Sequence, residues 1–162
     1  MGSHNILSQC DRALVAYLIS TGAGTEDDTY PAKRSADKAL PNTVCHSQKW
    51  RFLTPNSGVY VVQAQVLVHT DPSVDVDETA EDKKEASENR VISTFDSFFI
   101  GVDSSSETLA EAINAAAAGA GMDDFTIQSC VAEGGDSGND EKRNAWLDAI
   151  DLEIICCPRN VS

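Results

Sequence analysis

Two segments with the alternating pattern of β-strands lie close together in the middle of the chain. Thr43 to Leu53 and Val59 to Thr70 are separated by Thr54 to Gly58, and the Thr-Pro-Asn-Ser-Gly composition of this link is typical of an antiparallel hairpin. Alternate residues of a strand point to the same face. In the second strand we expect one such set to face the core: Tyr60, Val62, Ala64, Val66 and Val68.

Helices are predicted on both sides of this hairpin. Asn5 to Ile19 has apolar residues at three- and four-residue steps, which is the stripe of a helix that lies on a core. The same spacing predicts a helix from Ala86 to Phe99 that ends near Gly101. Ala110 to Ala118 has high helix propensity. We therefore expect three helices.

The C-terminal part of the chain is predicted to add strands to the hairpin. Phe125 to Ala132 alternates as a short strand, Glu133 to Asp140 has a turn composition, and Asn144 to Cys157 is a long final strand. Thr25 to Pro41 is polar and is expected to be a surface connection. This order predicts a single α+β domain over residues 5–162, with an antiparallel sheet of about four strands and helices packed on one face.

The segment Asp71 to Glu85 is the most acidic part of the chain and contains no aromatic residue. Self-repulsion favours a solvated, flexible loop, and calcium-loop spacing is absent. We expect this acidic loop to face a partner, and its candidate residues are Asp71, Asp75, Asp77, Glu78, Glu81 and Asp82.

Charge and hydropathy restrict the class of function. The 162 residues include 26 acidic and 12 basic side chains, for a net charge of −14, which repels a phosphate backbone. No apolar run reaches the roughly 18 to 20 residues that cross a bilayer, and no signal peptide is predicted, so a cytoplasmic location is expected. Residues 1–4, Met-Gly-Ser-His, are interpreted as a vector-derived addition.

The sequence does not contain a strong catalytic, metal or cofactor motif. Cys45 and His46 are adjacent on a strand and point to opposite faces, so they cannot form a catalytic pair with each other. A catalytic pair would need His69 to reach across the hairpin to the first strand. We expect instead a buried thiol at Cys45 and surface histidines at His46 and His69. Cys156 and Cys157 lack zinc-site spacing, and the glycine-rich segments lack the Lys of a phosphate loop. We therefore predict no enzymatic activity, no metal and no cofactor.

Three large aromatic residues are candidates for subunit contacts, because aromatic side chains dominate interface hot spots. They are Trp50, Tyr60 and Trp146. A place in the core is the alternative for each of them.

The whole chain resembles the tail-terminator and tail-completion (minor tail) proteins of long-tailed bacteriophages. The resemblance lies in the order of elements and in several segments: Asp11 to Val15, Leu40 to Val44, Tyr60 to Val68, Arg90 to Phe99, Leu109 to Asn114 and Trp146 to Pro158. It implies a small α+β subunit of a ring, commonly a hexamer, that caps the completed tail tube and provides the surface on which the head docks.

The resemblance also implies partners and a location. They are further copies of the chain, the tail tube protein and the head–tail connector, at the head-proximal end of the virion tail after assembly in the host cytoplasm. DNA would cross the ring without specific binding, which suits a negative lumen, and the acidic loop 71–85 is the candidate lumen-facing or partner-facing segment. The alternatives are a head-completion or head–tail joining adaptor, an acidic DNA mimic or inhibitor, and an enzyme that uses Cys45 or His69.

Overall fold

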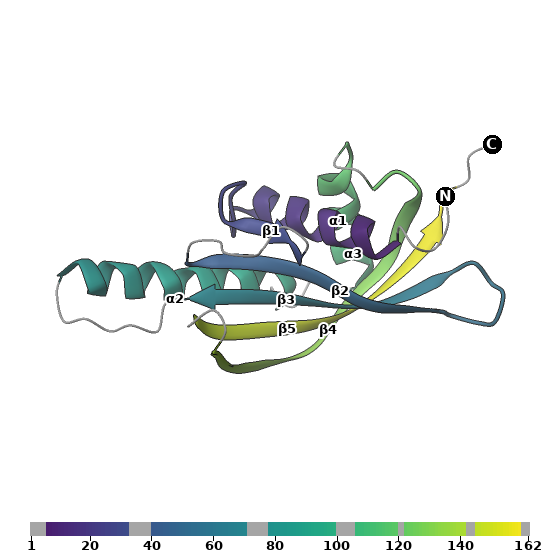
Figure 1. Cartoon of the computed structure of the whole chain (residues 1–162). Helices are drawn as coiled ribbons and strands as arrows, with labels where there is room; N and C mark the ends of the chain where they lie inside the picture. The colour runs from purple at the N-terminus through teal and green to yellow at the C-terminus, as the bar shows by residue number, and fades with distance from the viewer. Residues whose placement is uncertain are drawn as a thin grey trace.

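The computed structural model describes residues 6–32, 40–70, 78–99, 106–119, 122–141 and 145–159. These residues form three helices and five strands, arranged as in Figure 1. In chain order they are α1 (Ile6–Thr21), β1 (Thr29–Pro31), β2 (Asn42–Phe52), β3 (Tyr60–Thr70), α2 (Glu78–Phe99), α3 (Ser106–Ala117), β4 (Phe125–Asp140) and β5 (Ala145–Pro158). The α+β class is as predicted.

The five strands form one sheet in the order β1-β2-β3-β5-β4. β2, β3, β5 and β4 pair antiparallel, while the short β1 pairs parallel with the start of β2, at residues 43–45. The sheet is therefore mixed. We expected about four antiparallel strands, and the parallel strand β1 was not predicted. Two register shifts in β4, between Ile127 and Ser129 and between Ala132 and Gly134, mark β-bulges.

The β2–β3 hairpin extends beyond the helices as an arm (Figure 1). The residues of its turn were predicted from their composition, and Asn56 and Gly58 have the positive φ typical of such turns, at 60° and 74°. Leu53 closes the hairpin by donating its backbone N–H to the carbonyl of Val59, at 2.8 Å. The predicted hairpin is confirmed, with three of its four strand ends shifted by one residue.

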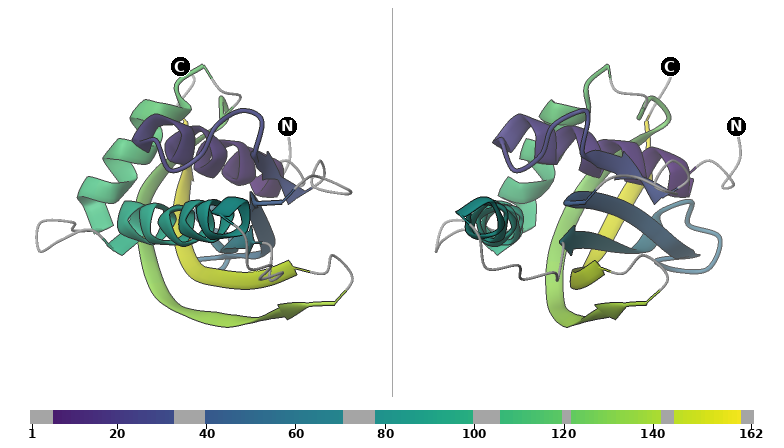
Figure 2. Two further views of the ribbon diagram at one scale, coloured as in Figure 1. Left: turned by 90° about the vertical axis from the view of Figure 1, so that its left-hand side faces the viewer. Right: turned by 60° about the vertical axis from the view of Figure 1, so that its left-hand side comes forward.

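All three helices lie on the same, concave face of the sheet, whose β4 and β5 ends curve around them (Figure 2). The helix-free side is called the outer face below. The expected core residues of β3 are buried beneath the helices. They meet the apolar stripe of α1, whose buried members include Ile6, Cys10, Leu14 and Leu18.

Side-chain bonds tie α2 to the start of the fold. Arg90, which is only 9% exposed, forms an ion pair with Asp28 at 2.8 Å and donates to the hydroxyl of Thr43 at 2.9 Å. The Tyr17 hydroxyl donates to the carbonyl of Ser97 at 2.5 Å. These bonds fix α2 against α1 and against the link that leads into the sheet.

Three expectations about loops were wrong. The acidic segment 71–85 was expected to be a flexible loop, but its residues 78–85 belong to α2, because Glu, Ala and Lys favour a helix despite their charge. Residues 71–77 lie outside the described residues. Residues 133–140 were expected to form a turn, but they continue β4 because they pair with β5. Residues 25–41 were expected to be a surface connection without regular structure, but they include β1, which forms because residues 29–31 pair with β2.

Within the ranges that the structure covers, no helix combines the length and the apolar character needed to cross a membrane.

Candidate assembly surfaces

The outer face carries polar side chains that change in charge from one side of the sheet to the other. The strand register places Lys49 of β2 opposite Gln63 of β3, and Gln63 opposite Glu153 of β5. Glu153 in turn lies opposite Val131 of β4. One row across the sheet therefore runs from a cation through an amide to a carboxylate.

The amides in the middle of this face donate toward the acidic strands. Gln63 Nε2 donates to Glu153 Oε2 at 3.3 Å, and Gln65 Nε2 donates to Asp151 Oδ1 at 2.8 Å. Gln48 Nε2 donates to Gln65 Oε1 at 2.8 Å. These bonds hold the two carboxylates in place on the outer face.

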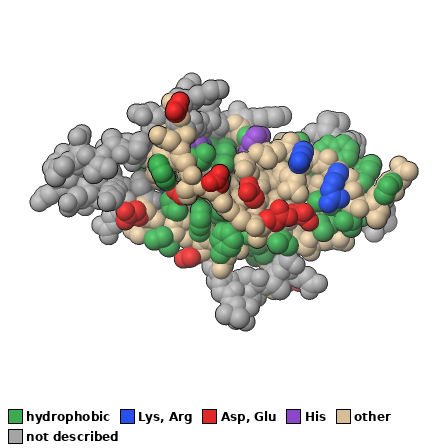
Figure 3. Space-filling view, turned by 90° about the horizontal axis from the view of Figure 1, so that it is seen from below, with side chains coloured by type: hydrophobic (Ala, Val, Ile, Leu, Met, Phe, Trp, Pro, Cys, Tyr) green, Lys and Arg blue, Asp and Glu red, His purple; other side chains and the backbone are tan. Residues whose placement is uncertain are grey.

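Glu133 completes a group of three carboxyls, Glu133, Asp151 and Glu153, that is called the acidic side below. A hydrogen bond with the Glu153 carboxyl raises the pKa of Glu133, and desolvation and repulsion by Glu153 and Asp151 raise it further. In Figure 3, which looks onto this face from below, Asp and Glu side chains gather in the middle.

Lys49 and Arg51 of β2, called the basic side below, are exposed on the same face. They stand two residues apart on one strand, so both side chains point outward. Figure 3 shows Lys and Arg side chains toward one end of the face, away from most of the Asp and Glu. The outer face is therefore dipolar.

Both long edges of the sheet are blocked at one point by a helix side chain. The Asn114 amide of α3 bonds the N–H and the carbonyl of Ile127 on β4, and a carboxylate oxygen of Asp11 on α1 accepts from the N–H of Ser47 on β2. β1 covers only residues 43–45 of β2. Beyond these caps the edges continue at Lys49 to Arg51 and at Ser129 to Val131.

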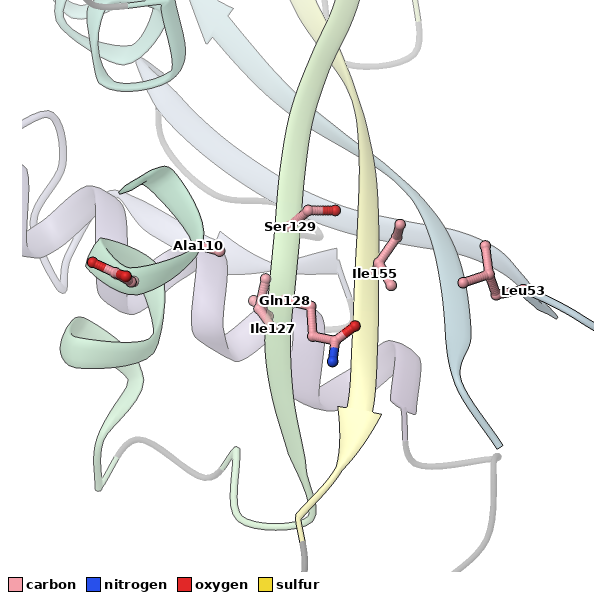
Figure 4. A pocket seen from close by; sticks show the side chains of 7 residues that line it. Leu53, Ala110, Ile127, Gln128, Ser129 and Ile155 are labelled. Atoms are coloured by element: carbon pink, nitrogen blue, oxygen red, sulfur yellow. The ribbon is translucent and has the colours of Figure 1, made fainter. Parts of the chain in front are cut away.

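A shallow hollow of about 490 Å³ lies beside the first bulge of β4 (Figure 4). It is lined by Leu53 of the hairpin, Ala110 and Glu111 of α3, Ile127, Gln128 and Ser129 of β4, and Ile155 of β5. Its lining spans both sides of the β4 edge, so the hollow belongs to the edge and not to the core.

The three candidate interface aromatics have different surroundings. Trp146 is 44% exposed and Trp50 is 38% exposed, whereas Tyr60 is 9% exposed. Tyr60 packs between Trp50 and Phe125, with ring centroids 5.1 Å and 5.5 Å away. Tyr60 is therefore a core residue, while both tryptophans present aromatic surface.

The residues considered for catalysis do not come together. Cys45 is buried in the core beneath the helices, while His69 lies on the opposite face of the sheet, across from Asn42. His46 is exposed, as expected, but His69 is only 2% exposed. The expectation of a surface His69 was wrong, because β3 is the central strand and has Asn42 and Leu147 on either side of this position.

The acidic candidates lie at or before the start of α2. Asp71, Asp75 and Asp77 lie outside the described residues, and Glu78, Glu81 and Asp82 belong to the helix. The side chains of the latter three fall outside the description. A lumen-facing or partner-facing role for this segment stays a prediction.

The five cysteines are reduced, and four of them are buried. Cys10 and Cys156 are 3.6 Å apart between their sulfurs, and this thiol hydrogen bond, with burial, raises the pKa of Cys10. Burial also raises the pKa of Cys45, and it raises that of Cys130 to about 12. Cys156 and Cys157, at the end of β5, point to opposite faces of the sheet as predicted. Cys156 lies in the core and Cys157 is half-buried. Among the described side chains, no group of three or more His, Cys, Asp and Glu is placed to hold a metal ion.

Sequence reasoning missed the charged residues of the outer face and the two edge caps. Alternation shows that Lys49 and Arg51 share one face, as do Asp151 and Glu153. The register shift between Ser47 and Lys49 decides which face the two cations take, and the sequence does not show that shift. Their arrangement depends on the strand order, which brings β5 beside β3.

No known protein family matches this chain. Comparison with curated proteins finds no match either.

Proposed function

We propose that this protein is a structural subunit that closes into a head-to-tail ring and caps a phage tail tube, as the resemblance to tail-terminator proteins implies. The ring is a hexamer, binds the tail tube protein on one side and offers the other side to the head–tail connector. No catalytic step is part of this function. Closure of such a ring needs two different surfaces on one subunit that fit each other.

The dipolar outer face is the observation that carries this proposal. A surface with Lys49 and Arg51 on one side and Asp151 and Glu153 on the other offers two unlike contacts to identical neighbours. The helices leave this face uncovered (Figure 2). Trp50 and Trp146 add exposed aromatic surface on the other, helix-bearing side of the sheet, and aromatic residues are the type that anchors interfaces.

The acidic balance of the chain agrees with the passage of DNA through the ring. A net charge of −14 keeps a DNA duplex from adhering to a subunit. The segment 71–85 remains the proposed lumen-facing or partner-facing part, and its six acidic candidates supply the repulsion.

Electron microscopy of the purified protein, alone and mixed with purified tail tubes, tests this proposal, with mass photometry to count subunits. We expect closed rings in solution, or one added layer at one end of each tube. A protein that stays monomeric and leaves the tubes unchanged would contradict the proposal. Binding to isolated connectors instead of tubes would favour the head-completion alternative.

A further inference from the structure

The two charged sides of the outer face lie at the same level along the strands. Lys49, Gln63 and Glu153 are consecutive partners across the sheet. The strands β2 and β5 are separated by two inter-strand spacings, or about 10 Å, and the strand between them carries Gln63. Lys49 and Glu153 thus lie on opposite sides of Gln63, about 10 Å apart, with no shift along the strand direction.

The open parts of both sheet edges lie at this same level. On β2, Lys49 to Arg51 follows the cap at Ser47, and on β4, Ser129 to Val131 follows the cap at Ile127. The register pairs Arg51 with Val61, Val61 with Ile155 and Ile155 with Ser129. Three antiparallel pairings separate β2 from β4, so the two edges run in opposite directions. A copy placed beside β4 therefore brings its own β2 alongside in antiparallel orientation.

Charge complementarity identifies the occupant of this surface as a second copy of the chain. Two molecules of net charge −14 repel each other, but charges more than about 8 Å apart are largely screened at physiological salt. Contacts between copies must then bring local opposite charges together. Lys49 and Arg51 are exposed, whereas Arg90 is held by Asp28 and Arg159 donates to a backbone carbonyl.

We propose that neighbouring copies dock side by side, with the basic side of one copy (Lys49 and Arg51) against the acidic side of the next (Glu133, Asp151 and Glu153). This inference rests on the proposed ring and names the two surfaces that form it. Val131, which is 44% exposed, lies beside Glu153 on the outer face and adds apolar surface to the contact. Trp50 points to the opposite face of β2, toward Tyr60, and is not part of this surface. The bulges of β4 prevent a continuous ladder of backbone hydrogen bonds between the two copies, so the contact is made by side chains.

Charge reversal tests this pairing with two variants. The first, K49E/R51E, makes the basic side acidic, and the second, D151K/E153K, makes the acidic side basic. Alone, each variant places like charges at every contact, and we expect association to weaken at least tenfold in sedimentation velocity at low salt. In an equimolar mixture every mixed contact regains opposite charges, so we expect alternating assemblies with an even number of subunits. Circular dichroism checks that each variant is folded.

A matched control changes the net charge elsewhere. Glu26 and Asp27 are exposed in the loop before β1, away from the outer face, and E26K/D27K alters the charge as much as D151K/E153K does. We expect this control to associate like the unchanged protein. Equal weakening in the control would show that net charge, and not this contact, governs association, and would overturn the inference.

The outcomes separate this inference from the proposed ring. Rings that form equally well with both reversed variants would overturn the pairing and leave the ring standing. Open chains that are lost in each variant and regained in the mixture would support the pairing and overturn the ring. A mixture that remains as dissociated as its components, or that stops at dimers, would overturn the head-to-tail contact.

Discussion

The side-chain amide of Asn114 bonds both backbone groups of Ile127, with Nδ2 donating to the carbonyl at 2.7 Å and Oδ1 accepting from the N–H at 3.0 Å. A helix side chain thus takes the place of a neighbouring strand at the edge of β4. The same amide holds α3 against the sheet.

Replacing Asn114 by Ala removes both bonds, and we expect the free energy of unfolding to fall by about 1 to 3 kcal/mol. Asn114→Asp keeps an acceptor for the Ile127 N–H but sets a carboxylate oxygen against the Ile127 carbonyl, so it should also lower stability. Urea unfolding followed by circular dichroism measures the difference. Glu111→Ala, at an exposed site on the same helix, is the control, and an equal loss there would contradict the assignment.

Acid should weaken the fold through Asp28. Partial burial raises its pKa, but hydrogen bonds from Arg90, the Thr25 N–H and Thr29, with the Arg90 charge, lower it overall from 3.8 to about 2. A lowered folded pKa stabilises the protein above the unfolded value, and this contribution is lost as the pH falls from about 4 to about 2. We expect a contribution of about 2 kcal/mol at neutral pH.

The measurement for Asp28 compares urea unfolding at pH 5.5 and pH 2.5. Asp28→Asn should lower stability at the higher pH and differ little from the unchanged protein at the lower pH. Asp27→Asn, at the exposed neighbour, is the control and should track the unchanged protein at both values. A pH-independent effect of Asp28→Asn would show that the ion pair with Arg90 is not the cause.

Adjacent glycines in β4 should respond differently to alanine. A Cβ on Gly135 would lie 2.7 Å from the carbonyl oxygen of Ala149, whereas a Cβ on Gly134 meets nothing within 4 Å. We expect Gly135→Ala to cost about 1 to 3 kcal/mol, because backbone must shift, and Gly134→Ala to change stability by less than about 1 kcal/mol. Thermal melting of the two variants measures this. Equal melting temperatures would mean that β4 does not pack on β5 as described.

One cysteine should react before the others. Cys157 is half-buried on the outer face, whereas Cys10, Cys45, Cys130 and Cys156 are buried. Since the thiolate is the reactive form and needs access, we expect a disulfide reagent to label Cys157 rapidly in the native protein and the rest only on unfolding. Cys157→Ser should abolish the fast phase. Two fast thiols would contradict the placement of β5.

The elements that were predicted correctly carry their pattern within themselves. α1 has its apolar stripe, and β3 and β5 alternate over eleven and fourteen residues. The core position of Val62 and the division of Cys156 from Cys157 followed from that alternation alone. Such signals are local and strong.

The parts that were missed depend on pairing across the chain. β1 is three residues long and exists because residues 29–31 pair with 43–45. The second half of β4 contains Gly, Asp and Ser, which disfavour strands, yet pairing with β5 overrides that preference. The charged sides of the outer face were missed for the same reason, since Glu133 and Glu153 meet only after β4 folds onto β5. The ring, its partners and its place in a virion stay predictions.

The two bulges of β4 limit how the edge of the sheet can pair with strands of other molecules. A regular edge strand is a template on which identical chains can polymerise into fibrils. At Gln128 and Glu133 the hydrogen-bonding groups fall out of step with any regular incoming strand. The bulged edge of β4 therefore disfavours amyloid-like growth.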